Sequence, residues 1–201
     1  MSKVSEANRI IESAVREFGA NVAVLTSFQR EGVVIVDIAR KVAPSIPVLT
    51  IDTGRLPQAT HEMIRSVEQR YGIAVERILP DAGEVASMVE AHGRDLFHDG
   101  YAQRLLCCQV RKVRPLERRM RGVGAFFAGL RRAQSESRGD IEVVDRSSTP
   151  VKISPLADWS AEDVLQYTRE NRLPEHPLYA QGYTSIGCDP CTRAVRPGED
   201  E

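Results

Sequence analysis

Four cysteines have the most distinctive chemistry in this sequence, and they fall into two pairs. Cys107 and Cys108 are adjacent, and Cys188 and Cys191 form a C-x-x-C motif about eighty residues later. Four thiolates can complete the coordination of a zinc ion or of a 4Fe-4S cluster. Neighbouring side chains on a helix point about 100° apart, which suits a wide cluster better than one tetrahedral ion. The layout favours a 4Fe-4S cluster over zinc, and the alternatives are small buried hydrophobes or a redox pair.

Positive charge is concentrated around the first cysteine pair. Between Arg104 and Arg121 there are seven basic residues and one acid, Glu117. The formal net charge of the whole chain is −1, so the molecule as a whole offers no nucleic-acid footprint. Arg111 and Lys112 lie one helical turn from the cysteines and are hard to explain as a solvated helix face. We expect them to face something negative.

The composition is that of an ordinary globular domain. The chain has 201 residues, of which 42% are hydrophobic and 27% charged. No apolar run approaches the roughly 20 residues of a membrane span, and the N-terminus has no signal-peptide core. Four cysteines without a dense framework fit a reducing compartment. We therefore expect a cytoplasmic protein with no membrane or nucleic-acid partner, and a homo-oligomer is left open.

Buried strands alternate with amphipathic helices along the chain. Helices are predicted at residues 5–18, 33–42, 58–71, 84–92 and 105–121, and a last one opens at Ser160; strands are predicted at 21–26, 47–51, 73–79 and 125–130, with an edge hairpin at 141–145 and 151–153. Residues from 172 onward read as loop. Strand–helix–strand order requires crossover connections. The predicted fold is α/β, a single domain at 1–201 with a mostly parallel twisted sheet and helices on both faces.

Three loops are expected at the carboxyl ends of the strands, where open parallel sheets bind ligands. Residues 26–32 offer hydroxyls and a helix N-terminus, which suit a phosphate. Residues 52–55 contain Gly54, which allows close backbone approach. Residues 129–135 carry paired arginines that can fork onto phosphate or sulfate oxygens. Each loop alone reads equally well as ordinary structure, but together they predict an anionic nucleotide ligand. The candidate binding residues are Ser27, Phe28, Gln29, Asp52, Thr53, Gly54, Arg55, Gly129, Arg131, Arg132 and Gln134.

Motifs along nearly the whole chain resemble one known family. They are the segments at residues 26–29, 51–56, 107–116, 129–135, 155–159 and 181–193, the last reading Gln-Gly-Tyr-x-Ser-Ile-Gly-Cys-x-Pro-Cys-Thr-Arg. In this order they resemble the assimilatory adenylyl-sulfate (APS) reductases, within the phosphoadenylyl-sulfate (PAPS) reductase family. The resemblance implies an adenine-nucleotide alpha-hydrolase-like fold and a 4Fe-4S cluster on the four cysteines. The family's cluster-free branch uses PAPS, so the intact cysteine pairs favour APS.

The resemblance also implies a mechanism. In the family a thiol attacks the sulfur of APS, giving an enzyme S-sulfocysteine and AMP, and thioredoxin or a similar thiol donor then releases sulfite for cysteine biosynthesis. The cluster is not expected to change its oxidation state. By analogy, Lys112 lies between cluster and sulfate as an electrostatic catalytic residue, the first two loops hold the nucleotide, and Arg131 and Arg132 lie on its phosphosulfate side.

Two departures from the family pattern bear on function. Ala133 stands where the family often has an acid. The family also continues past residues 197–200 into a tail that carries the nucleophilic cysteine, whereas this sequence ends at Glu201. We therefore expect a reductase core without its nucleophile, inactive on its own. Other readings are a PAPS-using reductase, a non-catalytic iron–sulfur nucleotide-binding or sensing protein, and an ATP pyrophosphatase or sulfurylase-type adenylyl transferase. The last needs a Ser-Gly-Gly-x-Asp-Ser type loop, which residues 26–32 lack.

Overall fold

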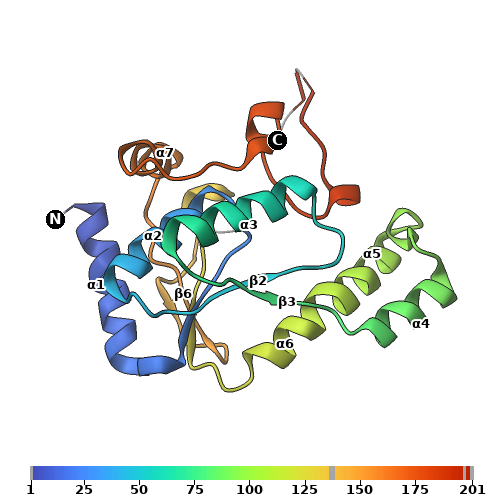
Figure 1. Ribbon diagram of the computed structural model, residues 1–201, viewed down its shortest axis with the longest axis horizontal. Helices are drawn as coiled ribbons and strands as arrows, with labels where there is room; N and C mark the ends of the chain where they lie inside the picture. The colour runs from blue at the N-terminus through green and yellow to red at the C-terminus, as the bar shows by residue number, and fades with distance from the viewer. Residues whose placement is uncertain (1, 136–138, 197, 200–201) are drawn as a thin grey trace.

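A single sheet runs through the centre of the computed structural model, which describes residues 2–135, 139–196 and 198–199 (Figure 1). Within that part of the chain the sheet has six strands in the spatial order β3-β2-β1-β4-β6-β5. They are β1 (Val22–Leu25), β2 (Val48–Ile51), β3 (Glu76–Ile78), β4 (Ala125–Phe127), β5 (Val144–Asp145) and β6 (Val151–Ile153). All neighbouring pairs are parallel except β5 and β6. The predicted mostly parallel α/β sheet is therefore confirmed.

The central strands are buried on both faces because alternate side chains serve two different cores. In β1, Val22 and Val24 belong to the larger hydrophobic cluster, whereas Ala23 packs into a second cluster on the opposite face. In β4, Phe127 belongs to the larger cluster and Phe126 packs against the second one. Continuous apolar runs are the expected signature of such doubly covered strands. This is why the short runs in the sequence predicted the strands correctly.

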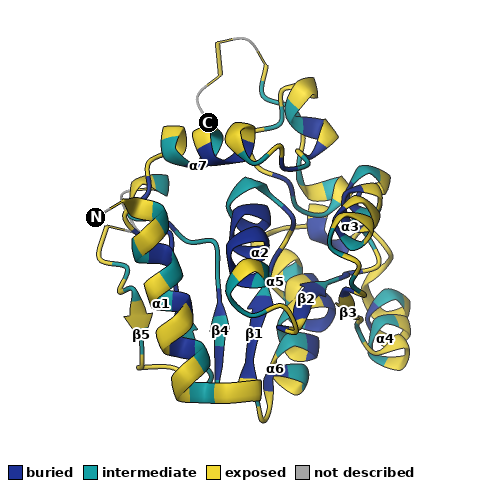
Figure 2. Ribbon diagram, turned by 60° about the vertical axis from the view of Figure 1, so that its left-hand side comes forward, coloured by how far each residue is buried: buried dark blue, intermediate teal, exposed yellow. Residues whose placement is uncertain are grey.

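Helices cover both faces of the sheet. Four of them supply side chains to the larger cluster: α1 (Lys3–Phe18), α2 (Arg30–Val42), α3 (Gln58–Tyr71) and α7 (Ala161–Glu170). On the other face lies α6 (Arg114–Met120), whose Met120 joins the second cluster. Helix α4 (Ala82–His92), the short turn η2 (Leu96–His98) and helix α5 (Tyr101–Cys108) share a third cluster, which contains Cys107. Figure 2 shows α2 and the central strands as the most deeply buried elements.

Most predicted helix ends match the structure because their capping chemistry is local. Ser160 caps α7, accepting the Asp163 N–H at 3.1 Å while the Asp163 carboxylate accepts the Ser160 N–H at 2.6 Å. Gly72 ends α3 in the left-handed region. Several boundaries differ. Helix α2 begins at Arg30, so the first loop is shorter than predicted, and three strands are shorter than predicted: β3 (Glu76–Ile78), β4 (Ala125–Phe127) and β5 (Val144–Asp145).

The predicted basic helix at 105–121 is divided into three parts. Helix α5 ends at Cys108, a π-helical turn η3 spans Gln109–Val113, and α6 follows from Arg114. Pro115 cannot donate a backbone hydrogen bond, and its ring clashes with the carbonyl four residues earlier. The widened turn relieves this conflict directly before the proline. Such π turns occur frequently at functional sites, and this one carries Arg111 and Lys112.

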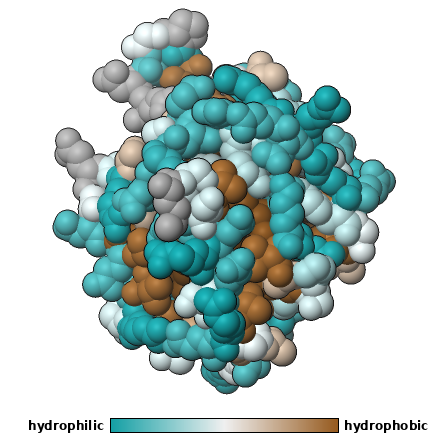
Figure 3. Space-filling model, turned by 90° about the vertical axis from the view of Figure 1, so that its left-hand side faces the viewer, coloured by the Kyte–Doolittle hydropathy of each residue, from teal (hydrophilic) through white to brown (hydrophobic). Residues whose placement is uncertain are grey.

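The rest of the described chain surrounds the sheet without further long elements. No helix among the described residues is long and apolar enough to cross a membrane. The face that carries α1 is mainly hydrophilic, with bands of hydrophobic residues between the hydrophilic ones (Figure 3). Pro197 and residues 200–201, after which the family's tail is expected to continue, lie outside the described residues.

Candidate functional site

The connections of the sheet reverse direction at the boundary between β1 and β4. From β1 the chain proceeds through β2 to β3 on one side, and it later places β4 and β6 on the other side. Ligands of open parallel sheets bind outside the carboxyl ends of the strands at such a switch point. The loops after β1 and β4 border this point, and the loop after β2 is next to them. The three predicted loops therefore lie at one edge.

The loop after β1 is a sharply constrained turn. Phe28 has a φ of 59° and is 0% exposed, and its N–H donates to Thr26 Oγ1 at 2.9 Å. A positive φ is strained for a bulky residue and persists only where the surroundings enforce it. A Cβ at residue 32 would overlap the Thr26 side chain, so Gly32 is needed where α2 passes the turn. The strain fixes the directions of Ser27 and Gln29.

Gln29 is bound to the protein at both ends of its carboxamide. Its Nε2 donates to Ser27 Oγ at 3.1 Å, and its Oε1 accepts the backbone N–H of Ile186 at 3.1 Å. Ile186 is separated from Gln29 by 157 residues and precedes Cys188 by two. The predicted nucleotide residue Gln29 therefore joins the first loop to the segment that bears the C-x-x-C motif.

The loop after β2 is held by its own side chains. Asp52 is 7% exposed, and its Oδ1 accepts the Gly54 N–H at 3.0 Å. Thr53 Oγ1 accepts the Arg55 N–H at 3.2 Å. Gly54 has a φ of 70°, a conformation that is easy for glycine and strained for other residues. Sequence reasoning missed His61, whose Nδ1 lies 3.8 Å from Asp52 Oδ2. No pattern in the sequence links these two residues.

Arg55 points toward the connection between α4 and α5. Its Nη1 donates to the Arg94 carbonyl at 2.7 Å, its Nη2 pairs with Asp95 at 2.6 Å, and its guanidinium lies 4.7 Å from the centre of the Phe97 ring. Phe97 packs in the cluster that contains Cys107. Arg55 thus ties the second loop to the packing around the cysteine helix.

The two predicted arginines after β4 have different environments. Arg131 is 7% exposed, and its Nε and Nη2 both lie 2.8 Å from Glu31 Oε1. Arg132 is more exposed and pairs with the surface carboxylate of Asp158. A Cβ at Gly129 would come within 2.9 Å of the Glu31 side chain, so the third loop packs closely on the start of α2. Gln134 Oε1 accepts the Arg131 N–H at 3.2 Å and supports that loop. Glu31 was not predicted, because its partner is distant in sequence.

The four cysteines lie on two segments that both contact the second loop. Cys107 and Cys108 end α5, and Cys188 and Cys191 lie at the turn η7 (Asp189–Cys191). Thr53 Oγ1 is 3.1 Å from Cys188 Sγ, and the Asp189 N–H donates to the Arg55 carbonyl at 2.8 Å. Cys107 is buried, Cys188 half-buried, and Cys108 and Cys191 are exposed.

The thiols are close enough to affect one another electrostatically. Burial raises the pKa of the Cys107 thiol; the Arg111 charge opposes this, and Cys108 and Cys188 add to it. Burial also raises the pKa of Cys191, and the other three cysteines add to that rise. The four thiols are therefore within electrostatic range of one another. Among the described residues, no three His, Cys, Asp or Glu side chains are arranged to hold a single metal ion.

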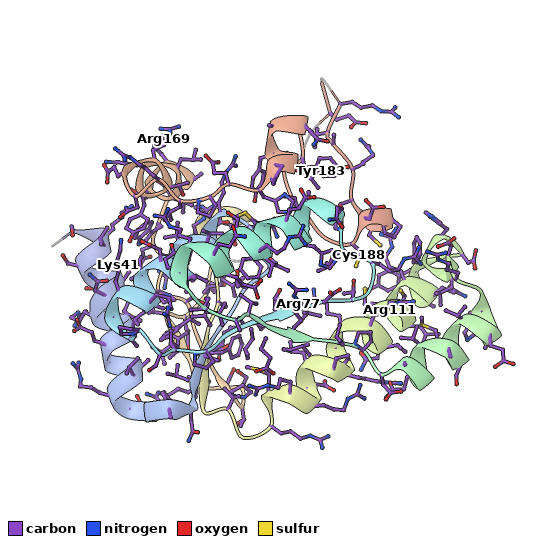
Figure 4. The ribbon with its side chains drawn as sticks, in the orientation of Figure 1. Lys41, Arg77, Arg111, Arg169, Tyr183 and Cys188 are labelled. Carbon is purple, nitrogen blue, oxygen red and sulfur yellow. The ribbon has the colours of Figure 1, made fainter. Side chains whose placement is uncertain are left out.

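Arg111 and Lys112 are neighbours with different surroundings. Arg111 is 9% exposed, its Nη1 donates to the Thr53 carbonyl at 3.0 Å, and its buried Nε has no hydrogen-bond partner. Figure 4 shows Arg111 beside Cys188, between α5 and the C-terminal segment. Lys112 is exposed on the π-helical turn. In the sequence Lys112 follows Cys107 by five residues and Cys108 by four.

The segment after α7 is fixed by buried polar contacts that the sequence did not reveal. His176 is 2% exposed; its Nε2 bonds Thr60 Oγ1 at 3.0 Å and its Nδ1 accepts the Leu178 N–H at 3.3 Å. Burial lowers the pKa of His176, so the ring is neutral and Nε2 is the donor. Arg30 stacks on the Tyr179 ring at 3.8 Å. These contacts hold the chain over α2 and α3 on its way to Cys188.

Comparison with known proteins agrees with this architecture. The fold and its edge loops define an α/β domain of the adenine-nucleotide alpha-hydrolase-like class. A crystal structure of phosphoadenylyl-sulfate reductase from Candida auris, a phosphate complex, aligns with a TM-score of 0.77 and 28% identity over 94% of this chain and 90% of that one. Candida glabrata FMN adenylyltransferase aligns with a TM-score of 0.65 at 12% identity, which shows the fold alone.

Sequence relatives identify the family. Residues 21–194 match the model of the phosphoadenosine phosphosulfate reductase domain, and the chain belongs to this family. A relative from Allochromatium vinosum named adenosine 5'-phosphosulfate reductase is 40% identical over 99% of this chain and 78% of its own length. One of the same name from Burkholderia cepacia is 43% identical over 77% of this chain. The chain spans 63% of the latter's length, and 42% of a probable 5'-adenylylsulfate reductase from Oryza sativa.

Proposed function

We propose that this chain is the cluster- and nucleotide-binding core of a thioredoxin-dependent reductase that converts APS to sulfite and AMP in sulfate assimilation. One observation carries the proposal: the loop after β2 touches both cysteine segments, through Thr53 with Cys188 and through the Thr53 carbonyl with Arg111. A ligand held by that loop is therefore adjacent to the cysteines. The names of the sequence relatives favour APS as the substrate.

The cofactor in this proposal is a 4Fe-4S cluster held by Cys107, Cys108, Cys188 and Cys191. The donor set suits it chemically, since four thiolates complete the ligand set of a cubane. The buried Arg111 also fits an anionic group, because its free Nε–H needs an acceptor. When bound, the cluster supplies a compact negative charge next to the substrate loop.

The chain's own residues bind and orient the nucleotide. The turn at 26–29 presents the N-terminus of α2, whose backbone N–H groups and dipole favour a phosphate. The Asp52–Gly54 turn offers close backbone approach beside it. Lys112 is an exposed cation on η3, four residues after Cys108, and its role here is to reduce the repulsion between cluster and sulfate.

The reaction requires a thiolate from outside these four cysteines. It attacks the sulfate sulfur, the S–O bond to the phosphate breaks, and AMP leaves with the bonding electrons. A second thiolate then attacks the cysteine Sγ of the S-sulfocysteine, the bond from Sγ to the sulfo group breaks, sulfite leaves with the bonding electrons, and a disulfide remains. A dithiol such as thioredoxin supplies the two electrons. The chain contains four cysteines, and each is assigned to the cluster.

Anaerobic calorimetry of the purified protein with APS, PAPS and AMP tests the proposal. APS should bind more tightly than AMP because it carries the sulfate, and PAPS should bind more weakly than APS. A preference for PAPS would assign the chain to the branch that uses the 3'-phosphorylated nucleotide. Failure to bind any of the three would reject the nucleotide site.

A further inference from the structure

The segment that carries the C-x-x-C motif is suspended between two loops of the nucleotide site. At one end the Ile186 N–H donates to Gln29, in the loop after β1. At the other end Cys188 contacts Thr53 and Asp189 donates to Arg55, both in the loop after β2. The segment has no strand pairing, and its only regular structure among the described residues is the short turn η7. These three contacts are its links to the two loops.

Gln29 is suited to link the loop after β1 to the segment that carries the C-x-x-C motif. Its carboxamide uses a donor toward Ser27 and an acceptor toward Ile186 at the same time. A carboxamide offers a donor and an acceptor on one planar unit. Its backbone is fixed by the strained turn at Phe28, and Ile186 is 5% exposed. Both ends of the bridge are therefore ordered.

We propose that Gln29 is a positioning residue that couples the nucleotide loop to the cysteine centre, so that nucleotide binding and cluster binding strengthen each other. The inference rests on the proposed function, since it needs both ligands. A cluster bound to Cys188 restricts the position of the Ile186 N–H. The hydrogen bonds of Gln29 to Ile186 and Ser27 then restrict the position of the Ser27 side chain. A nucleotide on the loop stabilises the same bridge from the other side. Coupling between binding equilibria is reciprocal.

The test is the affinity for AMP, measured by calorimetry on cluster-loaded and on chelator-treated protein. The wild type should bind AMP more tightly when loaded. In Gln29→Ala this ratio should fall by about two- to tenfold, the range expected for one hydrogen bond. Gln58→Ala is the matched control, because Gln58 bonds only Glu62 within the first turn of α3, at 3.3 Å. It should keep the wild-type ratio.

Other roles for Gln29 predict different results. A residue that only contacts the nucleotide would weaken AMP binding equally in the two forms. A residue that only stabilises the fold would lower the melting temperature and leave the ratio unchanged. Either result overturns the coupling. Wild-type protein that binds no AMP, or contains no cluster, rejects the proposed function together with this inference.

A second measurement uses only loaded protein, in case the chelated form unfolds. Iron loss to an excess of chelator is followed by absorbance, with and without saturating AMP. AMP should slow iron loss from the wild type and from Gln58→Ala, and it should protect Gln29→Ala less. Equal protection of all three proteins contradicts the coupling.

Discussion

Arg111 and Lys112 are adjacent cations with different surroundings. Arg111 is buried against the Thr53 carbonyl, whereas Lys112 is exposed on the same π-helical turn. The first joins the cysteine helix to the second loop, and the second remains available to a ligand. A lysine suits that position because its ammonium is a compact charge that serves several acceptors.

Lys112→Ala should weaken APS binding more than AMP binding, because only APS places a sulfate beside the cluster. We expect a loss of roughly tenfold for APS, which corresponds to one charge-assisted contact of about 1.5 kcal/mol. Calorimetry measures both affinities. Arg118→Ala is the control, since Arg118 pairs with Glu84 at 2.7 Å on the surface. Equal losses for AMP and APS would make Lys112 a general phosphate contact instead.

Replacing Arg131 and replacing Arg132 by alanine should differ in their effect on stability and be similar in their effect on APS binding. Arg131→Ala leaves the half-buried Glu31 carboxylate without its partner, so we expect a loss of about 2 kcal/mol of unfolding free energy, less than for a fully buried pair. Arg132→Ala removes a surface pair and should cost less than about 1 kcal/mol. Each change should also weaken APS binding roughly tenfold if both face the phosphosulfate. Urea unfolding and calorimetry measure the two effects, and unchanged APS affinity would remove that arginine from the binding site.

Among the elements, the segment after α7 depends most on side-chain contacts. It is joined to α3 through His176 and Thr60, to α2 through Arg30 and Tyr179, and to the first loop through Gln29. This segment carries Cys188 and Cys191, and among the described residues it contains no strand or long helix. We therefore expect its geometry to be sensitive to single substitutions and to pH.

The His176 contact should make stability depend on pH. Burial lowers its pKa in the folded protein, so the folded state binds fewer protons than the unfolded state below the ordinary value of about 6.5. The contribution is fully present above that pH and is lost as the pH falls toward the folded pKa. His176→Gln keeps the hydrogen-bonding pattern without the titration, and urea unfolding between pH 7.5 and 5.5 should show a shallower decline. The exposed His92→Gln should behave as wild type, and parallel curves for wild type and His176→Gln would contradict this.

The sequence predicts most of the elements well because they depend on local patterns. Apolar runs identified β1 and β2, and Ser160 marked the start of α7. The links between elements were not predictable in this way. Gln29 with Ile186 and Glu31 with Arg131 join residues more than ninety positions apart, and neither spacing follows from a helix or strand period.

For the whole molecule, the four cysteines account for every thiol in the 201 residues. A cysteine bound to iron cannot attack sulfur while the cluster is intact, and sulfur attack needs a free thiolate. The 201-residue protein should therefore bind APS without releasing sulfite when thioredoxin is supplied. Mass spectrometry should find no added sulfite mass. A covalent adduct with the cluster intact would show that the nucleophile lies within this chain.

A gain of activity is the matching positive test. Fusing a cysteine-bearing C-terminal tail from an APS reductase of the family should give sulfite release that depends on APS and thioredoxin. The same fusion with its cysteine changed to serine should be inactive. Sulfite release from the serine form would again place the nucleophile among Cys107, Cys108, Cys188 and Cys191.

The central claim is that these four cysteines hold one 4Fe-4S cluster beside the nucleotide loops. Iron, zinc and acid-labile sulfide, measured on anaerobically purified protein, test it most directly. The account predicts iron and sulfide each near four per chain, the content of one cubane. It also predicts loss of both in Cys188→Ser. Stoichiometric zinc with no iron would contradict it.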